Sequence, residues 1–272
     1  MGFGWSLGFT PYNDWWKNSR KLFHRHFQPS AVVQFRPKKL KAAHEFLRRL
    51  LDDPANFHAH MQLMAGGTVS LILTFFLAML KYPEAQRKAQ EEIDAVIGTD
   101  RLPNFDDEPK LPYVAALVKE VFRWQQVAPF AIPHRVSADD VYKGYFIPRD
   151  SIVLGNAWAL LHDDALFPDP FTFKPERFYG PDVDPRLSGA LDYAFGFGRR
   201  VCPGRWMAQS FTWITIASTL AAFRLEKPLD ANGNAVEPSA AYSGGILASP
   251  EKFECIVKPR SRDAELLVRS TA

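Results

Sequence analysis

The chain has 272 residues, of which 47% are hydrophobic and 23% charged, and its formal net charge is +3. This composition is typical of a folded globular protein and excludes a largely disordered chain, and a net charge this small argues against a nucleic-acid partner. Two cysteines, Cys202 and Cys255, exclude a disulfide framework, but their spacing leaves open two free thiols or one disulfide.

The amino-terminal half predicts helices. Basic and aromatic residues follow helical spacing from Tyr12 to Leu51, until Asp53-Pro54 interrupts the pattern. An apolar segment interrupted by glycines follows, then a polar surface helix that Gly98 ends, then an amphipathic helix. These three segments are Phe57–Leu80, Glu84–Ile97 and Leu111–Gln125.

After Pro129 the sequence pattern changes from helical to strand-like. Short strand-like runs, separated by turns, are expected at Ala131–Val136, Val141–Phe146 and Ser151–Leu154. An irregular meander rich in Pro and Phe covers Asp164–Tyr179. A helix is predicted over Arg205–Phe223, and strand-like pieces lie between Tyr242 and Pro259. The expected fold class is therefore mainly α with a small β portion.

Membrane and zinc signals are weak. The longest apolar run, Val69–Leu80, is shorter than the about 20 residues that a membrane-spanning helix needs, and the amino-terminus lacks the pattern of a signal peptide. His58 and His60 lie close together but have no cysteine or carboxylate partner at zinc-type spacing. We expect a core helix and no zinc site.

One loop carries the clearest chemical signal. Residues 195–204 read Phe-Gly-Phe-Gly-Arg-Arg-Val-Cys-Pro-Gly. Glycines allow a loop to adopt positive φ and to bring its backbone close to a group, and the helix expected from Arg205 would direct its positive end towards a Cys202 thiolate. A buried cysteine beside a glycine-rich turn is the simpler alternative.

The loop resembles the haem-binding signature of the cytochrome P450 family, with the fixed positions Phe195, Gly198, Arg200, Cys202 and Gly204. The resemblance implies haem b as cofactor and Cys202 as the axial ligand of its iron. It further implies that Arg200 pairs with a haem propionate and that Phe195 packs against the proximal face of the ring.

A second set of charged residues fits the same resemblance. Glu120 and Arg123 lie three residues apart on one helix face, and Arg177 follows in the later Phe-Lys-Pro-Glu-Arg-Phe segment. In the family such residues form a buried ion network that serves folding and haem retention. An ordinary surface salt bridge is the alternative, and the order of the motifs along the chain favours the network.

The resemblance assigns further propionate contacts to Trp16 and Arg20, in a Trp-x-x-x-Arg pattern, and to His134 after Pro133. The basic surface near Trp16 fits an acidic electron donor, which the family implies to be an NADPH-dependent flavoprotein reductase. A solvated basic helix and a solvated strand histidine are the alternatives. The amino-acid sequence of residues 111–178 most resembles that of fungal members of the family.

The distal side departs from the family pattern. The family carries Ala/Gly-Gly-x-Asp/Glu-Thr over the iron, but here Ala65-Gly66-Gly67-Thr68 has no carboxylate before Thr68. Thr68 is the candidate for distal proton delivery. Two distant family segments appear joined near Gly66-Gly67, which predicts an internal deletion that opens the distal haem face.

We therefore expect a single, partial cytochrome P450 domain over residues 1–272, with an early basic helix region at 1–66 and the remainder at 67–272. The implied function is haem-thiolate monooxygenation of a small hydrophobic organic substrate by a monomer. An inactive relative, a haem-thiolate isomerase or peroxygenase, and a thiol protein using Cys202 and Cys255 are the alternatives. Full-length relatives reside on the endoplasmic reticulum membrane. This sequence shows no membrane anchor, which favours a cytoplasmic or undefined location.

Overall fold

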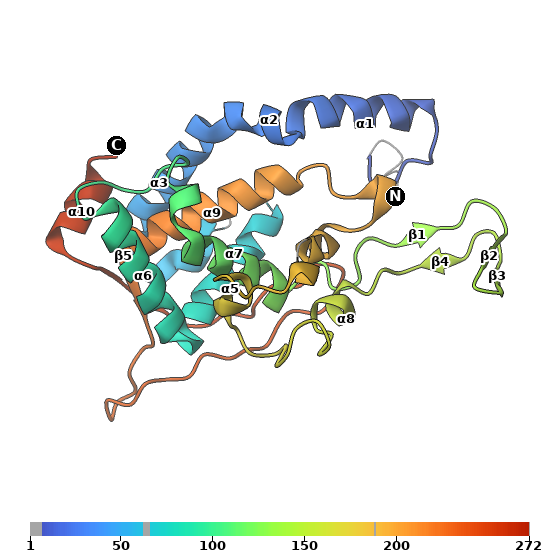
Figure 1. Ribbon diagram of the computed structural model, residues 1–272. Helices are drawn as coiled ribbons and strands as arrows, with labels where there is room; N and C mark the ends of the chain where they lie inside the picture. The colour runs from blue at the N-terminus through green and yellow to red at the C-terminus, as the bar shows by residue number, and fades with distance from the viewer. Residues whose placement is uncertain (1–6, 62–65, 188, 272) are drawn as a thin grey trace.

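The computed structural model describes residues 7–61, 66–187 and 189–271. Helices dominate it and all strands are short, which confirms the expected class (Figure 1). The longer helices are α1 (Asp14–Phe27), α3 (Arg36–Asp52), α5 (Gly66–Lys81), α6 (Pro83–Ile97), α7 (Pro112–Trp124) and α9 (Arg205–Ala222). The shorter ones are α2 (Pro29–Val32), α4 (Phe57–Met61), α8 (Ala157–Leu161) and α10 (Arg262–Arg269).

The core forms where α3, α5, α6 and α7 pack around α9. Every residue from Leu71 to Leu80 in α5 is buried, as is every residue from Thr212 to Leu220 in α9. Helices that are apolar on all sides belong in the interior, since no face of them gains from contact with water. The apolar run Val69–Leu80 is therefore mostly core helix.

Within the described ranges, no single helix has the length and apolar composition needed to cross a membrane. Residues 67–81 and 83–97 pass that test only as a pair, and the chain bends by 105° between them.

Prolines divide the first helical segment. The helical pattern expected from Tyr12 to Leu51 is broken into α1, α2 and α3, because Pro29 and Pro37 each stand in the first turn of a new helix. Figure 1 shows α1 along one edge of the molecule, outside the helical body that α3 enters.

The strands pair as three separate two-stranded sheets. The sequence expectation of one strand over Val141–Phe146 is wrong, because Lys143 and Gly144 have φ values of 51° and 83° and turn the chain back. Two residues with positive φ make the tight turn of a β-hairpin. The sheets are β1 (His134–Arg135) with β4 (Ile152–Val153), β2 (Asp140–Tyr142) with β3 (Tyr145–Ile147), and β5 (Phe223–Glu226) with β6 (Ile256–Pro259), all antiparallel.

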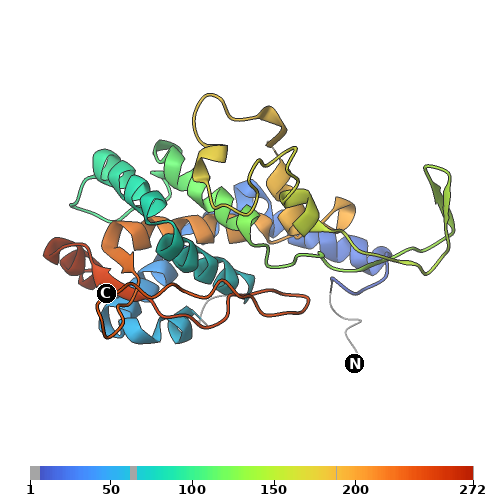
Figure 2. The same ribbon diagram turned by 90° about the horizontal axis from the view of Figure 1, so that it is seen from below.

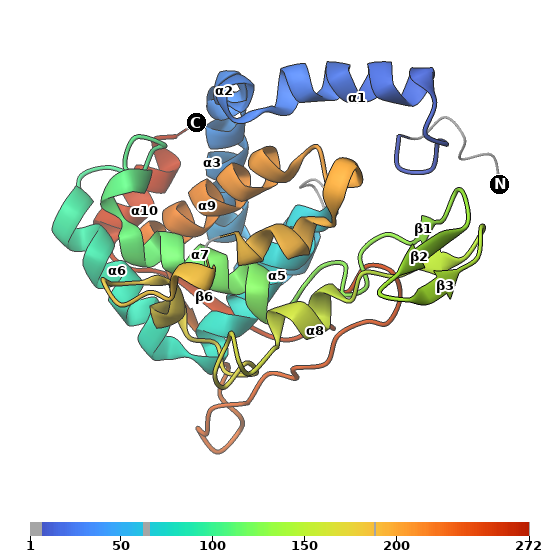
Figure 3. The same ribbon diagram turned by 45° about the vertical axis from the view of Figure 1, so that its right-hand side comes forward.

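The β1–β4 ribbon projects from the helical body and carries β2 and β3 at its tip (Figures 2 and 3). Three of these helices and strands were not expected from the sequence: α8, β5, which directly follows α9, and α10 near the carboxyl end. The proposed junction near Gly66-Gly67 adjoins residues 62–65, which lie outside the described residues, so the internal deletion stays a prediction.

Candidate functional site

The cysteine loop is a tight turn in front of α9. The Cys202 backbone N–H donates to the Phe195 carbonyl at 2.8 Å, which closes the loop on itself. Gly196 and Gly198 have φ values of 85° and 58°, which only glycine adopts without strain. Cys202 is exposed, and a Cβ placed on Gly204 would lie 3.9 Å from its Sγ. The loop therefore presents an accessible sulfur at the start of a long helix.

Phe195 and Phe197 anchor this loop from two sides. The Phe195 ring lies 5.4 Å from the ring of Phe122 on α7, against the core. A Cβ on Gly155 would lie only 2.2 Å from the Phe197 ring, so the loop packs directly on the backbone that follows β4. The absence of a side chain at Gly155 permits this close approach.

Arginines converge on Cys202. The pKa of Arg20 is lowered, chiefly by burial and further by the nearby cations Arg205 and Arg200, while the sulfur of Cys202 opposes this shift. Arg205 pairs with Asp192 at 3.5 Å. Within the described part of the chain, Arg20 and Arg200 have no ion-pair partner. Arg20 therefore lies near the sulfur and near two further guanidiniums, of which Arg205 has an acidic partner.

Trp16 and Arg200 lie against each other. The Arg200 guanidinium stands 4.3 Å from the centre of the Trp16 ring, in cation–π geometry. Both side chains donate to the backbone carbonyl of Leu7, at 3.1 Å from Trp16 Nε1 and 3.3 Å from Arg200 Nη1. Trp16 is buried and begins the face of α1 that meets the cysteine loop. Residues far apart in sequence thus converge beside Cys202.

The other expected site residues, His134 and Thr68, stand on β1 and α5. His134 is exposed on β1, opposite Val153, and its side chain has no hydrogen-bond partner among the described residues. Thr68 is buried in the first turn of α5. Its neighbour Gly67 lies close to Val127, whose carbonyl accepts from the Ala248 N–H at 2.8 Å. The start of α5 therefore meets the segment after α7 and the carboxyl-terminal tail.

The charged network is buried between α7 and the segment Pro175–Phe178. Arg123 donates to both carboxylate oxygens of Glu120, at 2.7 and 2.8 Å, and neither side chain is exposed. Arg177 Nε lies 3.4 Å from Glu120 Oε1, and the Lys174 N–H donates to the same oxygen at 2.8 Å. Burial raises the pKa of Glu120 and the guanidiniums oppose this. The three expected residues are thus brought together.

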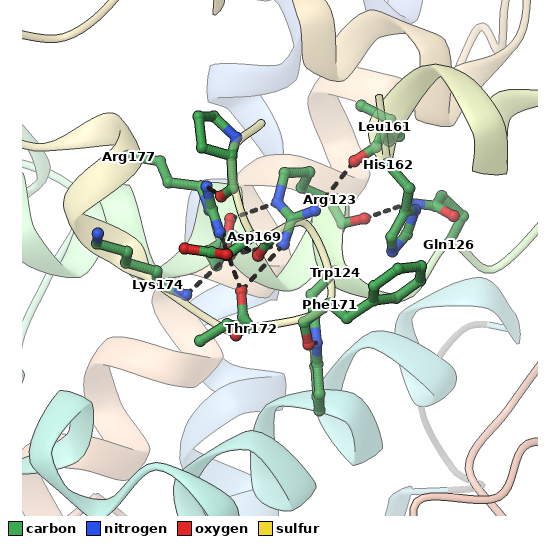
Figure 4. Close-up of polar contacts among 12 residues, drawn as sticks. Arg123, Trp124, Gln126, Leu161, His162, Asp169, Phe171, Thr172, Lys174 and Arg177 are labelled. Atoms are coloured by element: carbon green, nitrogen blue, oxygen red, sulfur yellow. Dashed lines mark hydrogen bonds and ion pairs between the residues drawn. The ribbon is translucent and has the colours of Figure 1, made fainter. Parts of the chain in front are cut away.

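Backbone carbonyls complete this network (Figure 4). Arg123 Nη1 donates to the Leu161 carbonyl at 2.9 Å. Arg177 donates to the carbonyls of Pro168 and Asp169 in the meander before it. The network therefore ties α7 to the irregular segment that leads to the cysteine loop.

Cys255 does not join Cys202. The two cysteines are free thiols, and Cys255 is buried on the chain just before β6. Burial raises the pKa of Cys255 to about 12, so it stays protonated at neutral pH. This arrangement opposes the alternative in which the two thiols act together.

Known proteins decide the family. The family model described as Cytochrome P450 matches residues 49–257. The chain belongs to the cytochrome P450 family. A cytochrome P450 monooxygenase, claR, of Ampulloclitocybe clavipes is 43% identical over 257 residues, covering 89% of this chain and 47% of the relative. A tryptamine 4-monooxygenase of Psilocybe cyanescens is 46% identical over 205 residues, covering 74% of this chain and 40% of the relative.

A solved zebrafish cytochrome P450 with progesterone has a TM-score of 0.62 and 31% identity, covering 71% of this chain and 42% of that one. The fold is thus a partial cytochrome P450 fold with fungal monooxygenases among its relatives. The chain spans less than half the length of the curated relatives it matches.

Sequence reasoning missed Arg205 and Leu7. Arg205 directly follows Gly204, so its place in the first turn after the cysteine could have indicated it. Leu7 acts through its backbone carbonyl, for which a sequence holds no signal.

Proposed function

We propose that this cytochrome P450 chain binds haem b with the Cys202 thiolate as axial ligand, as the proximal part of a haem-thiolate monooxygenase. The observation that supports this most is the exposed Cys202 beside Arg20, which itself lies near Arg200 and Arg205. A haem brings two carboxylates and an iron that takes a thiolate, so the donor set fits its charges and its ligand chemistry.

The chain's own residues would hold and orient the group. The Phe195 carbonyl fixes the Cys202 backbone, and the positive end of α9 favours an anionic sulfur. By the family resemblance, Trp16, Arg20 and Arg200 donate to the propionates. We assign His134 the same role and Phe195 the proximal face of the ring. When bound, the haem supplies the oxygen chemistry that inserts one oxygen atom into an organic substrate, which thiolate donation promotes.

Apolar loops on the tail side fit a small hydrophobic substrate. The bond from Ala248 to Val127 joins two segments with large exposed side chains: Phe130 and Ile132 on one, Ile246 and Leu247 on the other. Large exposed apolar side chains on two segments that a hydrogen bond joins mark a candidate binding surface. Thr68, whose neighbour Gly67 lies close to Val127, is our candidate for proton delivery on the distal side of the haem.

Electrons would come from an NADPH-dependent flavoprotein reductase. Helix α1 carries exposed cations at Lys21 and Arg25, and the exposed Lys17 pairs with the exposed Asp14. A positive surface speeds encounter with an acidic partner and makes the rate depend on salt.

The reduced carbon monoxide spectrum tests haem-thiolate binding directly. The chain is purified with haem supplied, reduced and exposed to carbon monoxide, beside a Cys202→Ala variant. A Soret band at the thiolate position that the variant lacks supports the proposal. Folded protein that shows no such band refutes it.

A catalytically inactive haem-binding relative is the second candidate. It is favoured by the absence of a carboxylate before Thr68 and by the share of the relatives that the chain spans. Sustained, coupled NADPH consumption with reductase and a substrate panel would refute inactivity. Turnover with hydrogen peroxide alone, without reductase, would identify a peroxygenase instead.

A further inference from the structure

The segment before α1 lies across the donors beside Cys202. We call residues 7–12 the amino-terminal strap. At one end of the strap the Leu7 carbonyl accepts hydrogen bonds from both Trp16 and Arg200, at 3.1 and 3.3 Å. Because these donors belong to α1 and to the cysteine loop, one neutral oxygen of the strap joins the two sides of the site.

Tyr12 holds the other end. Its ring lies 5.0 Å from the Trp16 ring, and the Arg199 guanidinium stands 4.9 Å from its centre. Arg199 also donates to the Tyr12 hydroxyl at 3.4 Å. Tyr12 is half exposed, so these contacts can be exchanged for water at modest cost. The two ends of the strap are therefore held by polar and ring contacts, and Thr10 between them is buried.

A neutral carbonyl is a weak acceptor for this place. A guanidinium and an indole N–H converge on it, and Arg20 lies near both the Cys202 sulfur and the Arg200 guanidinium. A carboxylate forms shorter and stronger hydrogen bonds with such donors than a peptide oxygen does. The surroundings are better matched to an anionic oxygen than to the one they hold.

We infer that the Leu7 carbonyl stands in for a porphyrin carboxylate, so that the strap is an autoinhibitory contact which an incoming haem must displace. This rests on the proposed haem binding. A site whose competent form requires release of the strap binds with an apparent affinity reduced by the fraction that is released. The two hydrogen bonds to Leu7 correspond to about a thirtyfold reduction.

A metal-free ligand isolates the carboxylate contact from iron ligation. We would titrate protoporphyrin IX and its dimethyl ester, by porphyrin fluorescence, into the full chain and into a chain lacking residues 1–8. Residues 1–8 contain no ionisable side chain, so the deletion removes the carbonyl without changing the side-chain charge. The ester keeps the ring and loses the two negative charges.

We expect the deletion to tighten binding of the free acid about thirtyfold and to leave the ester within twofold. An equal gain for acid and ester would mean that the deletion merely opens space, and would overturn the inference. An unchanged or weaker affinity for the acid would overturn it as well.

The unmodified chain gives a second measurement. Hydrogen exchange of residues 7–12 should speed up when protoporphyrin IX is added, since the strap leaves its donors. Unchanged or slower exchange with the porphyrin bound contradicts displacement. A thiolate Soret band with haem but no effect of the deletion would leave the proposed function standing and remove the strap inference. An effect of the deletion on porphyrin binding without a thiolate Soret band would support the strap inference and refute thiolate ligation.

Discussion

Arg123 and Glu120 form a bidentate ion pair that is closed off from water on every side. The two guanidinium nitrogens lie 2.7 and 2.8 Å from the two carboxylate oxygens. Removing one partner of a buried pair strands the other charge in a medium that solvates it poorly. This makes the pair the point at which the fold is most sensitive to the loss of a charge.

Glu120→Gln should lower the free energy of unfolding by about 3–5 kcal/mol, because it leaves Arg123 and Arg177 buried without a counter-charge. Urea unfolding followed by circular dichroism measures this. Glu84→Gln is the matched control, since Glu84 pairs with Arg87 on the exposed face of α6 and its loss should leave the unfolding midpoint unchanged. Equal effects of the two substitutions would contradict the buried network.

Gly155→Ala should disturb the cysteine loop, because the new Cβ would overlap the Phe197 ring at 2.2 Å. We expect a loss of about 1–3 kcal/mol of stability, typical of overpacking, together with weaker haem retention. Gly244→Ala is the control, since a Cβ at Gly244 has no neighbour within 4 Å. Thermal melts of the two variants decide between local strain and a general intolerance of alanine.

Arg20 should lower the stability of the haem-free protein and raise its affinity for haem. Its charge is partly buried and repelled by Arg205 and Arg200. Arg20→Gln should therefore keep or raise the melting temperature without haem and weaken haem affinity about tenfold, as expected for one lost charge-assisted hydrogen bond. Lys21→Gln, exposed on the same helix, should change neither quantity. An Arg20→Gln variant that retains haem as well as the parent would contradict the propionate role.

Lys39 gives the protein a pH dependence above neutrality. Burial, and next the neighbouring Arg36, lower the pKa of Lys39 to about 8, and its Nζ lies 2.5 Å from Ser210 Oγ. The unfolded chain holds this proton up to about pH 10.5, so stability lost to the buried charge is regained as pH rises from 8 to 10.5.

Lys39→Met should be about 1 kcal/mol more stable than the parent at pH 7, a value reduced for partial screening by solvent, and the gap should close by pH 10.5. Chemical unfolding of both chains at several pH values gives the difference directly. A gap that does not change with pH would show that packing, rather than charge, causes it.

The two cysteines should react at very different rates. Cys202 is exposed, whereas Cys255 is buried with its pKa raised to about 12. In the native haem-free chain a thiol reagent should label one cysteine quickly, and both after unfolding. Peptide mapping identifies the labelled residue, and bound haem should protect it. Rapid labelling of Cys255 in the folded chain would contradict its burial.

The sequence by itself indicated the family and singled out Cys202 as the proposed iron ligand. The spacing around Cys202 is a local pattern, because a tight loop, its glycines and the helix after it are neighbours along the chain. Helices such as Glu84–Ile97 were predictable for the same reason, since periodicity and end signals lie within each segment. The hairpin turn at Lys143-Gly144 was missed, because lysine seldom adopts positive φ without a tertiary setting that favours it.

Tertiary structure alone decided which groups meet. Glu120 and Arg177 are 57 positions apart by their numbers, and their contact depends on how the meander returns to α7. The sequence equally could not place the Leu7 carbonyl between Trp16 and Arg200, because every residue carries the same carbonyl and only packing selects one. The sequence thus suggests the chemistry proposed for Cys202, and the fold decides which side chains lie near it.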